Sequence, residues 1–205
     1  LIVADPLGMG KTASTVAGLK LVRQRHGGKT LIVVPSKVHK QWVVELKLAG
    51  LRPASIVCKR GFNKRRPSFD GDLYLTTLHF LANKIHTESE EFFAVDWDRV
   101  ILDEAHELTG PRLTKSFRKW RDGFCKVKAS IYWLVSATPF AYGPYGVERM
   151  VEWGSSDSNL SVTREITESF ISRFTRRTSE KDISKWVQIP PIERVDILIP
   201  MTSTE

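Results

Sequence analysis

The sequence predicts an α/β fold, with a mostly parallel sheet that carries helices on both faces. Three observations lead to this prediction. Short, uninterrupted apolar runs recur along the chain, as in strands that are buried on both faces. Segments with the apolar spacing of helices separate these runs, and this alternation is typical of parallel sheets. A glycine-rich loop stands between the first apolar run and the first helical segment.

The strands are expected where apolar residues follow one another without a break. These runs are 1–4, 31–34, 73–77, 100–102 and 132–135, with 55–58 as a weaker candidate. A final extended strand is expected over 195–199, where apolar and polar residues alternate.

Two helices are expected between the first strands. Residues 11–25 have helical apolar spacing, and Gly27-Gly28 is a plausible helix stop. Residues 36–49 form the second segment, with Ser36 as the expected N-cap. Trp42 fits the apolar face of this second helix, so we interpret it as a core residue.

The composition limits the class of protein. The chain has 205 residues, with 31 Lys and Arg against 23 Asp and Glu, a net charge of +8 and 41% hydrophobic residues. This balance excludes a disordered tail and a collagen-like repeat. Charges interrupt every apolar run before ~18 residues, so no membrane-spanning helix is expected. Two cysteines are too few for a disulfide scaffold and favour a reducing compartment. The positive charge favours a polyanionic partner such as nucleic acid.

The beginning of the chain suggests a piece of a longer protein, because Leu1 opens inside an apolar run where a start would carry Met. We therefore expect the 205 residues to form one domain, with the rest of the protein encoded on either side.

The first candidate site is a phosphate-binding loop. Its residues are Asp5, Pro6, Leu7, Gly8, Met9, Gly10, Lys11 and Thr12. Glycines let backbone N–H groups surround phosphate oxygens, and the following helix adds its positive end. Lys11 is expected to reach the outer phosphates, and Thr12 to ligate magnesium. Asp5 stands where the strict pattern has glycine. The alternative is an ordinary glycine turn, but the strand–loop–helix context favours the phosphate site.

The second candidate site is a pair of carboxylates at the end of the strand 100–102. Ligands of parallel sheets bind beyond the carboxyl ends of the strands, so this pair is expected to meet the phosphate loop. Asp103 is expected to hold magnesium, and Glu104 to orient and deprotonate an attacking water. His106 is expected to couple this site to a neighbouring element. A solvated acidic turn is the alternative for the pair taken alone.

A third element follows the strand 132–135. Ser136 and Thr138 are expected to hydrogen-bond the acidic segment that ends at His106 and to sense the γ-phosphate. Without the other two segments, a plain strand followed by a turn would be the better interpretation.

Taken together, the three segments resemble motifs I, II and III of the superfamily-two helicases and translocases. The segments are Gly8-Met9-Gly10-Lys11-Thr12, Asp103-Glu104-Ala105-His106 and Ser136-Ala137-Thr138-Pro139. The chain resembles the Swi/Snf-type DNA-dependent ATPases more closely. This narrower resemblance includes 31–36 with Gln41-Trp42, Leu75-Thr76-Thr77, Arg176-Arg177-Thr178 and Ile189-Pro190-Pro191. The departures from the family are Pro6, Ala137, the residues 107–110 and Ile192.

The resemblance implies a RecA-like P-loop NTPase lobe over 1–170, followed by an exit segment, 171–205, toward a second RecA-like lobe. It implies ATP and magnesium as cofactors and Lys11, Asp103 and Glu104 as catalytic residues. It also implies double-stranded DNA or chromatin as the partner, with DNA contacts at Ser36, Lys37 and Thr77.

The function that the resemblance implies is ATP-driven movement on double-stranded DNA, of the chromatin-remodelling type. An intracellular location is expected, nuclear in a eukaryote and cytoplasmic otherwise. The isolated lobe is expected to hydrolyse little ATP, because such engines need arginine fingers from the second lobe. Two alternatives remain: a strand-separating DExH-type helicase acting on DNA or RNA, and a degenerate lobe that binds only DNA or a protein.

Two clusters concentrate the positive charge. The first is Lys59, Arg60, Lys64, Arg65 and Arg66, and the second is Arg112, Lys115, Arg118, Lys119, Arg121, Lys126 and Lys128. Solvated surfaces are the favoured interpretation, and phosphate contact along a duplex is the alternative. Trp120 is expected in the core rather than as a stacking platform, and no spacing of histidines and cysteines indicates zinc.

Overall fold

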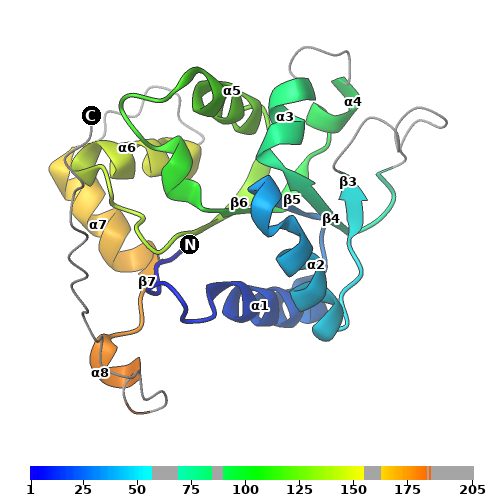
Figure 1. Ribbon diagram of the computed structural model, residues 1–205, viewed down its shortest axis with the longest axis horizontal. Coiled ribbons are helices and arrows are strands. Elements are labelled where there is room, and N and C mark those ends of the chain that lie inside the picture. The colour runs from blue at the N-terminus through cyan, green and yellow to red at the C-terminus, as the bar shows by residue number, and fades with distance from the viewer. Residues whose placement is uncertain (57–68, 85–89, 155–162, 184, 186–205) are drawn as a thin grey trace, which may run out of the picture.

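Parallel strands form the middle layer of the protein, as a computed structural model shows (Figure 1). The structure describes residues 1–56, 69–84, 90–154, 163–183 and 185. The strands are β1 (Ile2–Val3), β2 (Thr30–Val34), β3 (Ala54–Ile56), β4 (Leu73–Thr77), β5 (Trp97–Asp103), β6 (Ala129–Val135) and β7 (Thr175–Arg176). Their order in the sheet is β3-β4-β2-β5-β6-β1-β7, and every pairing between these described strands is parallel.

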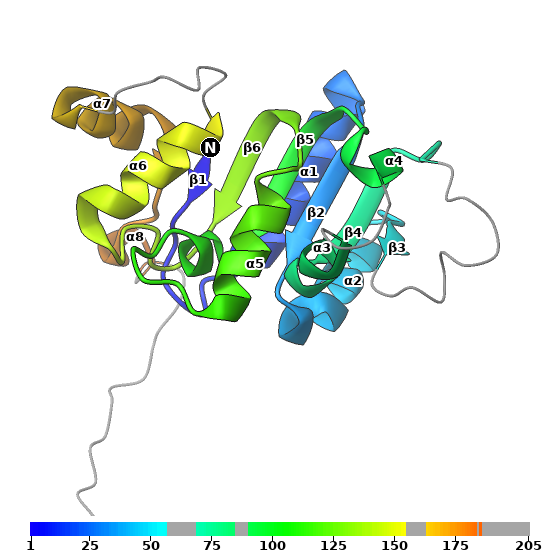
Figure 2. The ribbon, with the colours of Figure 1, turned by 90° about the horizontal axis from the view of Figure 1, so that it is seen from above.

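Helices cover both faces of the sheet (Figures 1 and 2). One face carries α1 (Lys11–His26) and α2 (His39–Leu48). The other carries α3 (Leu78–Lys84), α4 (Glu90–Phe93), α5 (Lys115–Phe124) and α6 (Gly143–Gly154). Beside α6 lies α7 (Arg164–Phe174), and α8 (Glu180–Ile183) follows β7. Two short 3-10 turns, η1 (Ser36–Val38) and η3 (Ala105–Leu108), follow the ends of strands.

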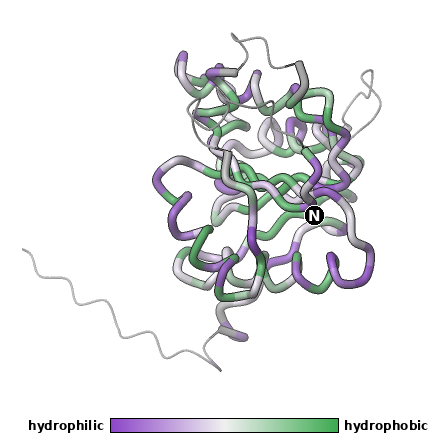
Figure 3. The backbone as a smooth tube through the Cα atoms, turned by 90° about the vertical axis from the view of Figure 1, so that its right-hand side faces the viewer, coloured by the Kyte–Doolittle hydropathy of each residue, from purple (hydrophilic) through white to green (hydrophobic). Residues whose placement is uncertain are grey.

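The strand residues divide between two cores because successive side chains of a strand point to opposite faces. Leu31 and Val33 pack into the core under α3 and α5, whereas Ile32 and Val34 pack with Trp42 under α1 and α2. All four strand residues are fully buried. Both faces of β2 are therefore apolar, which explains its unbroken apolar run. Figure 3 shows these hydrophobic strands between more hydrophilic outer segments.

The α/β class, the parallel sheet and the helices on both faces are confirmed. The predicted strand 73–77 coincides with β4, while β5 and β6 begin three residues earlier than predicted. The predicted strand 195–199 and the basic cluster at 59–66 lie outside the described residues. Within the described residues, no helix is both long enough and apolar enough to cross a membrane.

The predicted N-cap at Ser36 is wrong. Ser36 begins the 3-10 turn η1, which the hydrogen bond from the Val38 N–H to the Pro35 carbonyl closes at 3.1 Å. The helix α2 begins only at His39, without a side-chain cap. The fixed geometry of the X–Pro segment places the chain in a turn before the helix can start.

The predicted boundary at residue 170, between the lobe and an exit segment, stays a prediction. That position lies inside α7, and β7 pairs with β1 through Ile2–Thr175 and Val3–Arg176. The sheet of the lobe therefore extends to Arg176. The helix α7 was not predicted, although Thr163 caps it by accepting the Ile166 N–H at 3.3 Å, a recognisable sequence signal.

Candidate functional site

The candidate site lies where three neighbouring strands end. Strands β5, β6 and β1 are adjacent and parallel, so their carboxyl ends share one edge of the sheet. Asp103 ends β5, Ser136 follows β6, and the glycine-rich loop follows β1. The topology thus brings together three segments that span more than 130 positions of the sequence.

The loop after β1 leads into α1 through two glycines in left-handed conformations. Gly8 has φ 77° and Gly10, the N-cap of α1, has φ 70°. No side chain caps this helix, so its first N–H groups are oriented for an anion. The ammonium of Lys11 lies over the loop and donates a hydrogen bond to the Pro6 carbonyl at 3.1 Å. Thr12 lies half-buried in the first turn of α1.

Asp5 has a different role from the rest of the loop. Its Oδ1 accepts a hydrogen bond from the Thr178 N–H at 2.7 Å, and the Ala4 N–H donates to the Arg176 carbonyl at 2.8 Å. Asp5 therefore joins the start of the loop to the segment that follows β7. Sequence analysis did not predict this link, because the two residues stand 173 positions apart.

We expect Asp5→Ala to raise the KM for ATP by about three- to ten-fold, because the variant loses one hydrogen bond that holds the loop. Asp5→Asn is the matched variant, because its amide oxygen still accepts the Thr178 N–H. Steady-state ATPase measurements on the longer protein check this. Equal KM values for the alanine and asparagine variants would show that the hydrogen bond does not position the loop.

Asp103 is a buried carboxylate, with 7% of its surface exposed. Its Oδ2 accepts a hydrogen bond from the Trp42 indole N–H at 2.7 Å, and its Oδ1 accepts the Glu104 N–H at 3.0 Å. Burial raises the pKa of Asp103, while the hydrogen bond from Trp42 and the charge of Lys11 act in the opposite direction. Sequence reasoning placed Trp42 in the core, which is correct, but missed its bond to the carboxylate.

Glu104 is held in an unusual backbone conformation. Among the described residues it is the one non-glycine residue with positive φ, at 53°. Such a conformation costs about 1–3 kcal/mol and is common at functional sites. Its carboxylate lies 3.3 Å from His106 Nδ1. The hydrogen bond with His106 lowers the pKa of Glu104 more than burial raises it, and Lys11 and Lys37 lower it further.

His106 and Ser136 join the acidic pair to the third element. His106 Nδ1 lies 2.8 Å from the Ser136 hydroxyl, which also accepts the Thr138 N–H at 3.1 Å. Ser136 is fully buried. The predicted contact between the two elements is therefore present through Ser136. Thr138 takes part through its backbone, and its residue is exposed.

The three predicted DNA contacts differ in their surroundings. Ser36 is exposed, and the Lys37 side chain is 72% exposed, with its ammonium 3.8 Å from Glu107. Such an exposed ion pair is weak, so Lys37 is available to other partners. Thr77 is only 5% exposed, and its hydroxyl accepts the Phe80 N–H at 3.2 Å. The Thr77 hydroxyl therefore caps the start of α3, and the predicted DNA contact at Thr77 stays a prediction.

The site has the donors that a magnesium–nucleotide complex needs. The uncapped start of α1 offers N–H groups to phosphates, and Asp103 is a buried carboxylate that a nearby cation would stabilise. Lys11 affects the pKa of both Asp103 and Glu104, so the loop and the acidic pair lie close together. In the described part of the chain, no group of three or more His, Cys, Asp or Glu side chains gathers as a metal site. Magnesium would therefore rest on Asp103, Thr12 and the phosphates.

This fold and this edge of the sheet define a RecA-like lobe of the P-loop ATPase class. The family model of the SNF2-related domain matches residues 1–149. The chain therefore belongs to the SNF2-related family of helicase-like ATPases.

Comparisons with individual proteins agree with this family. The RNA polymerase-associated protein RapA of Pseudomonas aeruginosa is 32% identical over 114 residues, 53% of this chain and 12% of RapA. Transcription termination factor 2 of Drosophila melanogaster is 30% identical over 119 residues, 56% of this chain and 11% of that protein. The chain thus spans only about an eighth of the length of these relatives.

Two solved structures share the fold. The Sulfolobus solfataricus SWI2/SNF2 ATPase core in complex with dsDNA has a TM-score of 0.64 and 22% identity, over 90% of this chain and 41% of that one. The Pyrococcus furiosus Hef helicase domain has a TM-score of 0.51 and 14% identity, over 94% of this chain and 38% of that one.

Proposed function

We propose that the chain is the first, ATP-binding lobe of a motor that moves along double-stranded DNA by hydrolysing ATP with magnesium. The observation that carries the proposal is the edge of the sheet where the loop, the acidic pair and Ser136 follow the ends of the neighbouring strands β1, β5 and β6. The chain has the residues that ATP hydrolysis needs, which are Lys11, Thr12, Asp103 and Glu104. Their presence favours a hydrolysing lobe over a degenerate one.

In the proposed mechanism, the N–H groups at the start of α1 bind the phosphates, and Lys11 exchanges the Pro6 carbonyl for an outer phosphate oxygen. Thr12 and Asp103 would hold magnesium, which supplies positive charge to the phosphate oxygens when it is bound. Glu104 orients a water and accepts its proton as the water attacks the γ-phosphorus and ADP leaves.

The contact between His106 and Ser136 gives the proposed coupling between the acidic pair and the third element. His106 lies within reach of both the Glu104 carboxylate and the Ser136 hydroxyl, at 3.3 and 2.8 Å. A shift of the segment after β6 would therefore be transmitted to the group that positions the water. A second lobe, outside this chain, is the proposed supplier of the arginine fingers.

DNA is the proposed partner on the same edge of the sheet, with Ser36 and Lys37 as contacts. Both follow β2 and are exposed. The names of the relatives RapA and transcription termination factor 2 connect those proteins with transcription, which supports a nucleic-acid partner and an intracellular location for this chain. The location would be nuclear in a eukaryote and cytoplasmic otherwise.

The test uses the longer protein and its Lys11→Ala variant, in which the loop loses its ammonium. We expect DNA-stimulated ATP hydrolysis and displacement of a third strand from a DNA triplex, both lost in Lys11→Ala. Separation of the two strands of a duplex would instead favour the helicase alternative. Activity that is unchanged in Lys11→Ala would favour a degenerate lobe that binds only DNA or a protein.

A second prediction concerns the 205-residue chain by itself. We expect it to bind ATP weakly and to hydrolyse it at a small fraction of the rate of the longer protein, because a trans-acting arginine contributes about 10³–10⁵ in rate in related chemistry. Isothermal titration and a phosphate-release assay measure both quantities. Robust DNA-stimulated hydrolysis by the isolated chain would contradict the need for a second lobe.

A further inference from the structure

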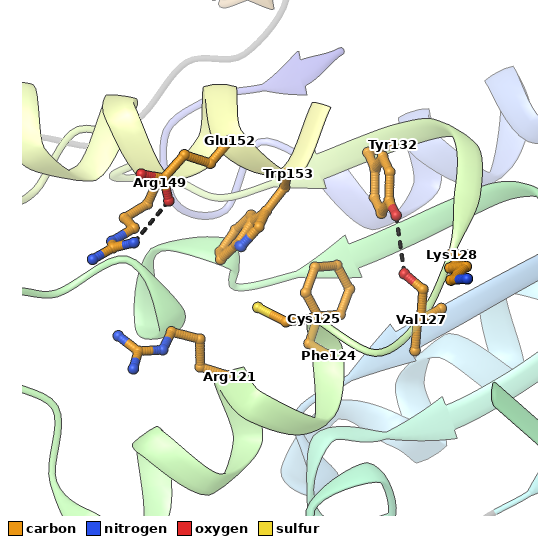
Figure 4. A pocket seen from close by; sticks show the side chains of 9 residues that line it. All are labelled: Arg121, Phe124, Cys125, Val127, Lys128, Tyr132, Arg149, Glu152 and Trp153. Atoms are coloured by element: carbon orange, nitrogen blue, oxygen red, sulfur yellow. Dashed lines mark hydrogen bonds and ion pairs between the residues drawn. The ribbon is translucent and has the colours of Figure 1, made fainter. Parts of the chain in front are cut away.

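A pocket of about 450 Å³ lies on the helical face of the lobe, away from the nucleotide edge. The end of α5, the turn before β6, and the last turns of α6 form its walls (Figure 4). The strand β6 runs from this turn to the edge at Ser136, and Tyr132, the lining residue on β6, lies four residues or roughly 13 Å before Ser136. The pocket therefore belongs to a different surface from the site described above.

The floor of this pocket is aromatic. Phe124 is almost fully buried, and its ring meets Trp153 edge-on, with centroids 5.3 Å apart, and Tyr132 at 6.2 Å. The Tyr132 hydroxyl donates a hydrogen bond to the Val127 carbonyl at 2.9 Å, which fixes this ring. An apolar or aromatic side chain entering the pocket would therefore find a preformed apolar surface.

The rim of the pocket is cationic. Arg121, Lys128 and Arg149 line the pocket, and Glu152 is the one carboxylate among the lining residues. Arg149 is oriented by its ion pair with Glu152 at 2.7 Å and by the Tyr145 hydroxyl. Arg121 lies 3.7 Å from Asp122, its neighbour in sequence. An acidic ligand would meet a surplus of positive charge at the mouth and an apolar surface below it.

The backbone of the pocket offers little to a compact anion. The N–H groups of Cys125, Lys126 and Val127 already donate to carbonyls of α5, at 2.8, 3.3 and 2.9 Å. A bound phosphate would therefore find side-chain donors but no backbone cradle.

We propose that this pocket, which we call the α5–α6 pocket, binds an acidic peptide segment of a partner protein that inserts one aromatic side chain. Carboxylates of the peptide pair with Arg121 and Lys128, while its aromatic side chain rests on Trp153 and Tyr132, which are half-buried and line the pocket. Arg149 is held by Glu152 and shapes the far wall. This peptide-binding role is independent of nucleotide hydrolysis.

Cys125 provides a reporter for the test, because its thiol lies in the pocket wall and its residue is exposed. The chain has two cysteines, so Cys58→Ser leaves Cys125 as the single thiol. The probe is the fluorescent pentapeptide Asp-Glu-Phe-Glu-Asp. We expect saturable binding, and we expect the bound peptide to slow maleimide labelling of Cys125 at least five-fold. The peptide Asp-Glu-Ala-Glu-Asp should bind at least ten-fold more weakly.

Charge reversal of residues on the rim provides the second part of the test. Arg121→Glu and Lys128→Glu should each weaken peptide binding about ten-fold, whereas Lys119→Glu, an equal charge change on the exposed side of α5, should change it less than two-fold. These positions are exposed or half-exposed, so the variants are expected to fold, and their unfolding curves check this. Equal effects of all three variants, or unhindered labelling with bound peptide, would overturn the proposal. Stronger protection of Cys125 by inorganic phosphate or by a 12-bp DNA duplex than by the peptide would also overturn it.

Discussion

Glu104→Gln is expected to reduce the turnover of ATP by the longer protein about 1,000-fold, within the range that general bases contribute. The glutamine retains the size of the side chain and the positive φ of the backbone, so the fold should change little. It loses the carboxylate that accepts a proton. The pKa of Glu104 is lowered by His106, so the native carboxylate is ionised at neutral pH and ready to orient water.

The same variant should still bind ATP, because Lys11 and the start of α1 are untouched. Single-turnover phosphate release measures the loss, and filter binding of labelled ATP measures the affinity. Glu107→Gln is the matched control: it removes a half-buried carboxylate of η3 that lies 3.8 Å from the Lys37 ammonium and has no proposed role in the reaction. At saturating DNA we expect it to change turnover less than about two-fold, as for a weak ion pair. Equal losses in both variants would remove Glu104 from its proposed role.

The elements that sequence analysis predicted best are those whose signal is local. β4 coincides with its apolar run because both of its faces are covered, and the glycine loop was recognisable because its glycines, lysine and threonine are contiguous. The start of the second helix was predicted wrongly at Ser36. The Pro35 carbonyl accepts the Val38 N–H there, so a 3-10 turn forms before the helix begins. Local preference alone does not decide between a cap and such a turn.

The contacts of the site that were missed join residues far apart in sequence. Trp42 lies 61 positions from Asp103 in the sequence. Its position on the apolar face of α2 explained the residue as part of the core, so no polar contact was predicted for it. Asp5 looked like a departure from the loop pattern until the Thr178 N–H was found beside it. The indole N–H of a tryptophan leaves no mark in the apolar pattern of the sequence. Only the folded structure therefore shows which group accepts its hydrogen bond.

The bond between Trp42 and Asp103 leads to the second large prediction. Trp42→Phe is expected to lower the free energy of unfolding by about 3 kcal/mol, from a lost hydrogen bond to a buried carboxylate and lost packing. Trp42 is fully buried, so water cannot replace the indole N–H. Under the proposed mechanism, Asp103 would also be less well positioned, and the magnesium concentration for half-maximal ATP hydrolysis should rise several-fold.

Trp97→Phe is the matched control for this change. Trp97 is 1% exposed, and in the described part of the chain its indole N–H is buried without a hydrogen-bond partner. The same substitution there removes packing but no bond, so we expect a loss of about 1 kcal/mol and an unchanged magnesium dependence. Urea denaturation of the chain and magnesium titrations of the longer protein measure both differences. If the two variants lose equal stability and share one magnesium dependence, the indole of Trp42 acts only as core packing, and Asp103 is positioned by the backbone of Glu104 alone.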